Sequence, residues 1–370
     1  MNLLVLDKRF AAIGAINDYV SLMWNRKYYE PGNFELHTIN QYWGLLNSGI
    51  YLWRSDAAEL GVIEEVIYQK DDSGLIAVTC KGHFAEVLLN KDFCSFSHET
   101  IDPITYAYDM VSFWVRNKNN SAADGDPIWA LGAGEIKNRN PVRLDFSVAS
   151  KTLGEKMYDL ERYCEATHTI SYDYEHNWIS LYLWQGKDRT TGQTENSWAL
   201  FSDAFCNVKS CQYHRSLSDY MDTAMVFGEG EGDDRIWKKV QVDGAKYSGY
   251  CLVVDARDLQ KTYKDGANVE HTYSDAEYER ILKQRGRDKL AKHPVVETVS
   301  CEVDHTANLK YKKDYDLGDI CTVQMAEIGV ETNMRLTEIA EIYENGRMKL
   351  SVEFGEGITT NLREIIRREL

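Results

Sequence analysis

The chain has 370 residues, enough for two or three domains, and its hydrophobic share of 44% and charged share of 27% are ordinary for a water-soluble globular protein. The formal net charge of −16 argues against a surface built to bind nucleic-acid phosphates, because such a surface needs clustered Lys and Arg. No apolar run approaches the roughly 20 residues of a membrane helix, so the sequence predicts no membrane span.

Residues 1–97 are predicted to form a first, antiparallel β-barrel-like domain. Met1–Asp7 has a short apolar run without a basic leader, and we expect a first strand there rather than a secretion signal. Short strands with turn signals between them are typical of such barrels. The expected strands are Ser21–Tyr28, Phe34–Ile39, Ile50–Trp53, Gly61–Tyr68 and Leu75–Lys81. Gly82–Leu89 is predicted to be a brief helix that follows them.

Residues 98–198 are predicted to be an α+β insertion domain. Asp102 followed by Pro103 is typical of a helix start. Thr152 and Glu155 form a capping box, in which the hydroxyl and the carboxylate satisfy free backbone N–H groups at a second helix start. Strands are expected at Ile128–Leu131 and Val142–Ser147, with a hairpin from Thr169–Tyr174 to Trp178–Trp184. Helices that alternate with hairpins indicate an α+β fold.

Residues 199–356 are predicted to form a second barrel-like domain with one helix. Ser274 and Glu277 make another capping box, and the helix after it ends before Pro294. Strands are expected at Ala224–Phe227, Lys238–Val242, Tyr250–Val254 and Val295–Val303. Residues 357–370 are predicted to be a short C-terminal helix.

The clearest pattern lies between Asp316 and Phe354, where apolar and polar residues alternate. Met348, Leu350, Val352 and Phe354 fall on one face of a strand that follows Asn345-Gly346. Asn-Gly between two alternating runs is a strong hairpin signal, since both residues tolerate the positive φ of a type I′ turn. The sequence therefore predicts a β-meander, and the fold class is α+β, mainly β.

Several stretches of the second half resemble the siphophage tail-hub family, which comprises baseplate-hub or tail-associated proteins at the distal end of the tail tube. They are Tyr311–Val323, Arg335–Ile339, Glu341–Tyr343, Phe354–Gly355 and, upstream and in the expected order, Val226–Arg235 and Val254–Leu259. The signature residues, for which we predict structural roles, are Asp314, Tyr315, Asp316, Leu317, Gly318, Asp319, Arg335, Gly228, Gly230, Gly232, Arg235, Asp255, Arg257 and Asp258.

The resemblance implies a structural, non-enzymatic hub without a cofactor. Two barrel-like domains would mimic tail-tube subunits, so that a homotrimer forms a pseudo-sixfold ring between the sixfold tube and a threefold tip. Its partners would be the distal tail protein, tail-tube proteins and tip or fibre proteins. DNA would pass through the channel without specific binding, which acidic walls would suit. The hub would be part of the virion, at the tail tip, after assembly in the bacterial cytoplasm.

Other chemistries have weaker support. The loop Gly228–Gly232 lacks the GxGxxG spacing and a following Lys, and its carboxylates would repel phosphate; calcium is the better alternative there, although the EF-hand spacing is missing. The histidines form no HExxH motif. A tail-borne cell-wall or polysaccharide hydrolase and a receptor-binding module remain the alternative functions, and the 9 Trp and 23 Tyr residues suit protein contacts or sugar binding.

The eight cysteines show no disulfide-framework spacing, and we expect buried free thiols in a reducing cytoplasm. They are Cys80, Cys94, Cys164, Cys206, Cys211, Cys251, Cys301 and Cys321.

Overall fold

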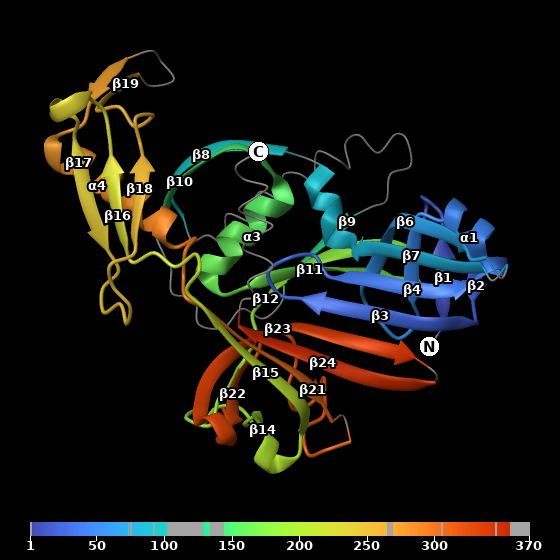
Figure 1. Cartoon of the computed structure of the whole chain (residues 1–370). Coiled ribbons are helices and arrows are strands. Elements are labelled where there is room, and N and C mark those ends of the chain that lie inside the picture. The colour runs from blue at the N-terminus through green and yellow to red at the C-terminus, as the bar shows by residue number, and fades with distance from the viewer. Residues whose placement is uncertain are drawn as a thin grey trace. The chain divides into compact units, whose positions relative to one another are not determined.

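The chain folds into two compact units in a computed structural model, whose elements are labelled in Figure 1. The first unit comprises Met1–Gln212 and Ser300–Phe354, and the second comprises Tyr213–Val299 and Gly355–Leu370. The residues that the structure describes are 2–72, 74, 76–91, 93–101, 129–133, 144–264, 269–304, 306–344 and 346–355.

The main sheet has 14 strands, with the path β15-β21-β24-β23-β3-β4-β7-β6-β5-β1-β2. Its N-terminal strands are β1 (Leu3–Leu6), β2 (Ala12–Ile16), β3 (Tyr19–Lys27), β4 (Asn33–Ile39), β5 (Tyr51–Arg54), β6 (Leu60–Lys70) and β7 (Ile76–Phe84). The later strands on this path are β15 (Val208–Ser216), β21 (Val296–Val303), β23 (Val330–Glu344) and β24 (Arg347–Gly355). Two short helices, η1 (Asn40–Tyr42) and α1 (Trp43–Ser48), connect β4 to β5.

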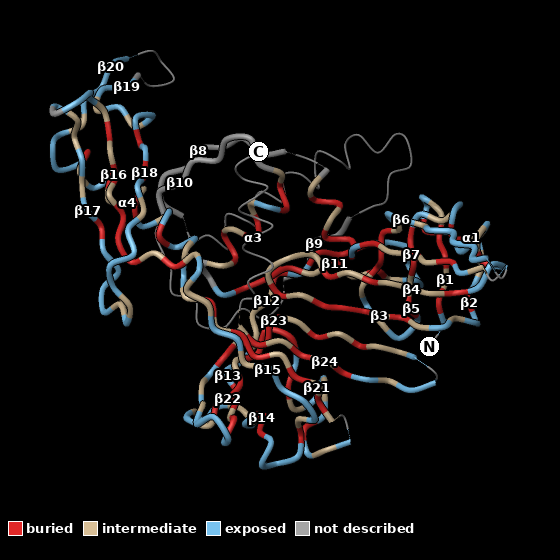
Figure 2. Tube along the Cα trace, in the orientation of Figure 1, coloured by how far each residue is buried: buried red, intermediate tan, exposed pale blue. Residues whose placement is uncertain are grey.

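A core of alternating side chains fills one side of this sheet. Leu22 and Trp24 of β3 and Leu36 of β4 are fully buried. Figure 2 shows buried residues along β3, β4 and β7. The alternation that predicted these strands is thus the alternation of buried and exposed side chains.

The predicted hairpin is confirmed as β23 and β24, in which Glu344 pairs with Arg347 across the turn. Leu350, Val352 and Phe354 are buried, as their spacing predicts. Gly346 has φ +72°, whereas Asn345 lies outside the described residues. On β23 a register shift between Leu336 and Glu338 moves the buried face from even-numbered to odd-numbered positions.

Strands on either side of the helix α3 (Leu153–Cys164) in the sequence form smaller sheets in the same unit. They are β8 (Phe93–Ile101), β9 (Trp129–Ala133), β10 (Leu144–Thr152), β11 (Thr167–Asp173) and β12 (Trp178–Trp184). The capping box of Thr152 and Glu155 is present at the start of α3. Met157 and Leu160 of α3 share a core with Ile170 and Leu181, so the helix packs on the β11–β12 hairpin.

Short elements complete the first unit. β22 (Ile320–Met325) pairs with β23 on one side and, in parallel, with β13 (Asp188–Arg189) and β14 (Leu200–Ser202) on the other. Besides η1, the 3₁₀ helices among the described residues of this unit are η2 (Ala85–Lys91), η4 (Asp203–Phe205) and η6 (Ala326–Ile328).

The second unit packs one helix on one sheet. α4 (Asp275–Leu290) begins at the predicted Ser274–Glu277 capping box and buries Tyr278 and Leu282 against the sheet. The sheet has the order β17-β16-β18, with β16 (Thr223–Phe227), β17 (Trp237–Gln241) and β18 (Cys251–Asp255). The described part of the second unit also contains the 3₁₀ helix η5 (Gly232–Asp234) and the hairpin of β19 (Thr262–Lys264) and β20 (Glu270–Thr272).

The predicted fold class, mainly β with large antiparallel sheets, is confirmed, and the described strands form open sheets rather than closed barrels. The helix expected at Gly82–Leu89 is wrong in its first half: β7 continues to Phe84 because the sheet pairing with β6 extends that far, with Phe84 opposite Gly61, and a 3₁₀ helix begins at Ala85. The helix expected after Asp102 and the C-terminal helix at residues 357–370 lie outside the described residues. The domain boundaries drawn from the sequence stay a prediction.

The expectation of buried thiols holds for only part of the cysteines. Cys80, Cys301 and Cys321 are buried, whereas Cys206, Cys211 and Cys251 are exposed. Cys211 and Cys251 lie on the solvent-exposed faces of their strands. The alternating pattern alone did not show which face of each strand is buried. The side chains of Cys94 and Cys164 lie outside the described residues.

Candidate functional site

The signature turn before β22 is fixed by the buried carboxylate of Asp319. Its Oδ1 accepts a hydrogen bond from the backbone N–H of Lys187 at 2.7 Å, and its Oδ2 accepts from Nε of Arg189 at 2.6 Å and from the backbone N–H of Asp316 at 2.9 Å. A buried carboxylate with this many donors keeps its charge satisfied. Asp319 therefore ties the turn to β13, more than a hundred positions earlier in the sequence.

Gly318 and Arg335 form the second fixed point of this turn. Arg335 donates from Nη1 to the carbonyl oxygen of Gly318 at 2.6 Å, and its guanidinium lies 5.2 Å from the ring centroid of Tyr28. Gly318 has φ +81°, and a Cβ atom there would lie 2.2 Å from Cε2 of Tyr28. Only glycine fits this turn without displacing Tyr28.

The other signature residues of this turn also have structural contacts. Asp314 accepts from the backbone N–H of Lys310 at 2.8 Å, and Leu317 is buried. Tyr315 is fully buried, with its ring edge-on to Phe201 at a centroid distance of 5.0 Å. The structure thus brings the seven signature residues from Asp314 to Asp319 and Arg335 together around one turn.

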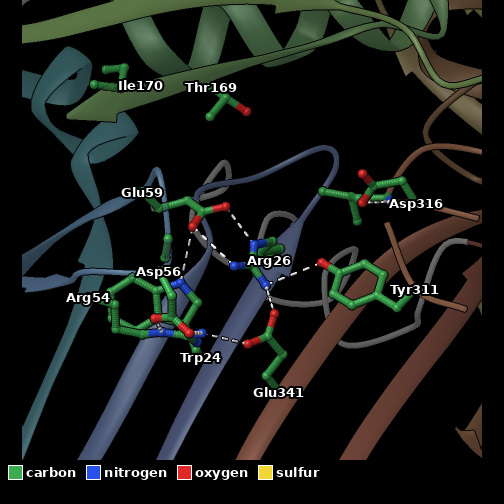
Figure 3. Close-up of polar contacts among 12 residues, drawn as sticks. Trp24, Arg26, Arg54, Asp56, Glu59, Thr169, Ile170, Tyr311, Asp316 and Glu341 are labelled. Carbon is green, nitrogen blue, oxygen red and sulfur yellow. Dashed lines mark hydrogen bonds and ion pairs between the residues drawn. The ribbon is translucent and has the colours of Figure 1, made fainter. Parts of the chain in front are cut away.

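A buried ion network lies beside this turn (Figure 3). Arg26 of β3 donates from Nε to Glu59 at 2.5 Å and from Nη1 to Glu341 of β23 at 2.5 Å, and Nη1 also lies 3.2 Å from the hydroxyl of Tyr311. The side chains of Arg26 and Glu341 are only 7% and 6% exposed. Each charge is therefore paired inside the protein rather than solvated.

Arg54 extends the network to a second cation. Its Nη2 donates to Oε2 of Glu341 at 2.8 Å, and its Nε donates to Asp56 at 3.1 Å. The guanidinium also lies 5.3 Å from the ring centroid of Trp24, a cation–π contact. Burial alone would raise the pKa of Glu341, but the charges of Arg26 and Arg54 outweigh it and lower that pKa to about 2. Glu341 is thus ionised at neutral pH and lies between two arginines.

A cavity of about 560 Å³ adjoins this network in the first unit. Its wall includes Arg26 and Glu59, the aromatic side chains of Trp184 and Tyr182, and two fully buried ionisable groups, Glu86 and His168. Thr169 and Ile170 of β11 lie above the ion network, at the top of the view in Figure 3.

Glu86 and His168 each leave one polar atom free in the part of the chain that the structure describes. Oε1 of Glu86 accepts from the backbone N–H of Ile170 at 2.8 Å, whereas Oε2 has no partner. Nδ1 of His168 lies 2.9 Å from Glu161, whereas Nε2 has no partner. Burial raises the pKa of Glu86 to about 7. Burial alone would lower the pKa of His168, but the carboxylate of Glu161 raises it. Glu86 can therefore gain or lose a proton near neutral pH.

The signature residues of the second unit meet at the ends of β16 and β18. Arg235 donates from Nη2 to Asp255 at 2.7 Å and from Nε to the carbonyl oxygen of Gly228 at 3.1 Å. Arg257 also binds Asp255, at 2.6 Å, and Asp258 accepts from Arg285 of α4. The hydrogen-bonded salt bridge from Arg257, with a smaller contribution from the charge of Arg235, lowers the pKa of Asp255 to about 2. The stretches Val226–Arg235 and Val254–Leu259 thus form one surface, which we call the acidic-loop surface.

The glycines of the acidic loop allow the backbone turn that leads into η5. Gly230 and Gly232 have positive φ, and Gly232 is the first residue of η5. The backbone N–H of Glu229 donates to the hydroxyl of Tyr278. Among the residues described, no group of three or more His, Cys, Asp or Glu side chains could hold a metal ion. The helices described here are all too short or too polar to cross a bilayer.

Sequence reasoning missed the buried ion network and the ionisable cavity wall. Arg26, Arg54 and Glu341 occupy inward positions of strands, where an apolar residue is expected. The sequence feature that could have indicated the network is Glu341. It lies in a stretch that carries the family resemblance, and it is a charged residue at a buried position of β23.

The comparisons with known proteins agree with this architecture. The family model of Siphovirus ReqiPepy6 Gp37-like proteins matches residues 2–104 and 124–356. No curated protein sequence matches the chain.

Solved structures of tail proteins have the same fold at low sequence identity. The tail protein from Neisseria meningitidis MC58 is 10% identical, with a TM-score of 0.55 and coverage of 96% of each chain. The 43 kDa tail protein of prophage MuSo2 from Shewanella oneidensis is 10% identical, with a TM-score of 0.55 and coverage of 96% of this chain and 98% of that one. Prophage tail protein gp18 from Listeria monocytogenes EGD-e is 11% identical, with a TM-score of 0.51 and coverage of 99% and 100%. The chain belongs to the family of Siphovirus ReqiPepy6 Gp37-like proteins and has the fold of phage tail proteins.

Proposed function

We propose that this chain is a structural baseplate-hub protein at the distal end of a siphophage tail tube. The observation that carries the proposal is the family match across residues 2–104 and 124–356, together with a fold shared with tail proteins along nearly the whole chain. In this role the chain closes the tube, adapts its sixfold symmetry to a threefold tip, and later lets DNA pass. The net charge of −16 suits a wall that does not retain DNA.

The signature residues support a role in shape rather than in chemistry. Asp319, Arg335 and Gly318 hold a turn through buried or semi-buried contacts, and Asp255 is paired with two arginines. Such groups are committed to internal partners and are not poised to act on a substrate. We propose that these residues fix the shape of the surfaces through which copies of the chain dock.

We place one subunit contact of the proposed homotrimer at β2. Among the described strands, β2 pairs only with β1, so one side of its backbone is open. Its sequence Ala-Ile-Gly-Ala-Ile has no charge, and Ile13 is 43% exposed. An uncharged open edge is a template for pairing with another chain, and a second copy of this chain is the occupant we propose.

A pair of variants tests this contact. Ile13→Lys puts a charge on the open edge, and Val20→Lys is the control, because Val20 is 57% exposed on β3, which has partners on both sides. We expect the first variant to reduce the trimer fraction in assembled tails or in native mass spectrometry, and the second to leave it unchanged. Equal trimer fractions in both variants would remove β2 from the interface.

Location in the particle tests the function itself. Antibodies against this chain should label purified phage at the end of the tail opposite the head. Labelling along the tail shaft or on the capsid, or absence of the chain from purified particles, contradicts the hub role.

The cavity favours a second candidate function, a tail-borne saccharide hydrolase. Glu86, with a pKa of about 7, could serve as an acid, and Glu59 as a carboxylate kept ionised by Arg26, while Trp184 and Tyr182 offer flat surfaces to a sugar ring. Clearing of host cell walls in a zymogram by the native chain, lost in Glu86→Gln and retained in Glu65→Gln, would establish this activity. No clearing by the native chain leaves the structural role alone.

A further inference from the structure

Two cysteines of the first unit lie side by side on neighbouring strands. Cys211 of β15 and Cys301 of β21 have their Sγ atoms 2.6 Å apart, and both thiols are free in this structure. Cys211 is exposed on the edge strand of the sheet, whereas Cys301 is 2% exposed. Solvent and small oxidants therefore reach Cys211 first.

The pair brackets Tyr213–Val299, the larger of the two stretches that make up the second unit. The chain leaves the first unit after Gln212 and returns to it at Ser300. Cys211 precedes the exit and Cys301 follows the return, 90 positions later. A covalent bond between them would close residues 212–300 into a loop and fasten the edge strand β15 to β21.

We propose that Cys211 and Cys301 are a redox modification site that forms an intrachain disulfide when the protein meets a low-molecular-weight disulfide such as oxidised glutathione. The Cys211 thiolate attacks the small disulfide, forming a mixed disulfide and releasing one small thiol. The Cys301 thiolate then attacks Sγ of Cys211, which forms the protein disulfide and releases the second small thiol. The protein loses two protons and two electrons, and the oxidant becomes two thiols.

The environment of the two thiols suits this order of attack. The hydrogen bond from the Cys301 thiol lowers the pKa of Cys211, whereas the same contact and burial raise the pKa of Cys301. The exposed thiol is therefore the better first nucleophile, and the buried thiol is within reach as the resolving group. Cys206 and Cys251 are exposed but have no thiol partner among the described residues, so they lack a resolving group.

The disulfide would keep the edge strand β15 from detaching from β21. It would also keep the two fragments of the chain linked if the chain is cut between the two cysteines. Edge strands are the parts of a sheet that open most easily, and a cross-link over a loop this long constrains the unfolded chain strongly. The timing rests on the proposed function: a tail protein assembled in a reducing cytoplasm would gain the bond after release of the particle. The chemistry itself does not depend on that function.

Oxidation of the purified full-length chain tests the site. The reduced protein is treated with oxidised glutathione, alkylated, digested without reduction and mapped by mass spectrometry. We expect one linked peptide pair containing Cys211 and Cys301, with a mass lower by two hydrogen atoms than the two thiol peptides combined. In Cys301→Ala, Cys211 should instead accumulate as the glutathione mixed disulfide. Cys206→Ser is the control and should form the link as the native chain does.

Two results would overturn the proposal. One is full alkylation of both Cys211 and Cys301 in the oxidised, folded native chain. The other is linkage of Cys211 to Cys206 in place of Cys301. A second readout is proteolysis: a protein nicked within residues 213–299 should run as one species without reductant and as two fragments with it, and separation without reductant contradicts the bond. None of these readouts requires a phage particle, so failure here is separate from failure of the hub role.

Discussion

Arg26 and Glu341, 315 positions apart in the sequence, form a buried ion pair across neighbouring strands, with Nη1 of Arg26 2.5 Å from Oε1 of Glu341. Their strands, β3 and β23, are where the N-terminal and C-terminal parts of the main sheet meet. Glu341 binds Arg54 as well as Arg26, and Arg26 binds Glu59 as well as Glu341. Four charged side chains therefore depend on one another where these two parts of the sheet meet.

Removal of the Glu341 carboxylate should strongly destabilise the sheet where β3 and β23 pair. Glu341→Ala leaves Arg26 and Arg54 without their common anion, and loss of one partner of a buried pair costs about 3–5 kcal/mol. Urea denaturation should show this loss in the free energy of unfolding. Glu344→Ala, at the exposed end of the same strand, is the control and should change it by about 0.5 kcal/mol or less. Equal effects of the two substitutions would mean that the network is not stabilising.

The same carboxylate should give the protein an acid-labile component of stability. The pKa of Glu341 is about 2 in the folded chain, below the usual 4.5, so the unfolded chain binds more protons between these values. Its stabilisation is present above pH ~4.5 and is lost as the pH falls towards ~2. The melting temperatures of the native chain and of Glu341→Gln should therefore converge as the pH is lowered. A constant difference across this range would contradict the pKa.

Glu86 should have the opposite pH dependence. Its pKa of about 7 lies above the usual 4.5, so the folded chain binds more protons than the unfolded chain between these values, and stability falls as the pH rises through ~7. Glu86→Gln keeps an oxygen for the N–H of Ile170 and removes the charge. The variant should gain stability relative to the native chain between pH ~5 and ~8. Glu65→Gln, on the exposed part of β6, should show no such gain, and a gain in both variants would point to general charge reduction instead.

Alanine substitutions at Gly318 and Gly346 should distinguish the free-energy cost of backbone strain from that of steric overlap. Both have positive φ, but a Cβ atom at Gly346 meets no atom within 4 Å, whereas at Gly318 it would lie 2.2 Å from Tyr28. Gly346→Ala should cost about 1–2 kcal/mol from the left-handed conformation alone. Gly318→Ala should cost about 1–3 kcal/mol more, because Tyr28 must move. Equal losses in thermal or urea unfolding would mean that Tyr28 yields freely.

The strands, the hairpin and the two capped helices were predictable from the sequence because their signals are local. Alternation places Leu350 and Val352 inside β24, and a hydroxyl three residues before a Glu marks the starts of α3 and α4. Each of these depends on contacts within a few residues or on a period that the sequence displays.

The ion network and the cavity were not predictable because they depend on pairing between distant segments. The register shift at Leu336 and Glu338 turns Glu341 inward, and nothing local signals that shift. Arg26, Arg54 and Glu59 are then tolerable inside only because Glu341 and one another satisfy their charges. The signature residues were found by resemblance, yet their contacts, such as Asp319 with Arg189, were visible only in the fold.

A reconstruction of the intact phage tail by electron cryomicroscopy tests the central claim most directly. The account predicts three copies of this chain in a ring at the distal end of the tail tube, around a channel wide enough for DNA. A well-resolved tail whose distal end contains no density for this fold, or contains it in a number that is not a multiple of three, would contradict it.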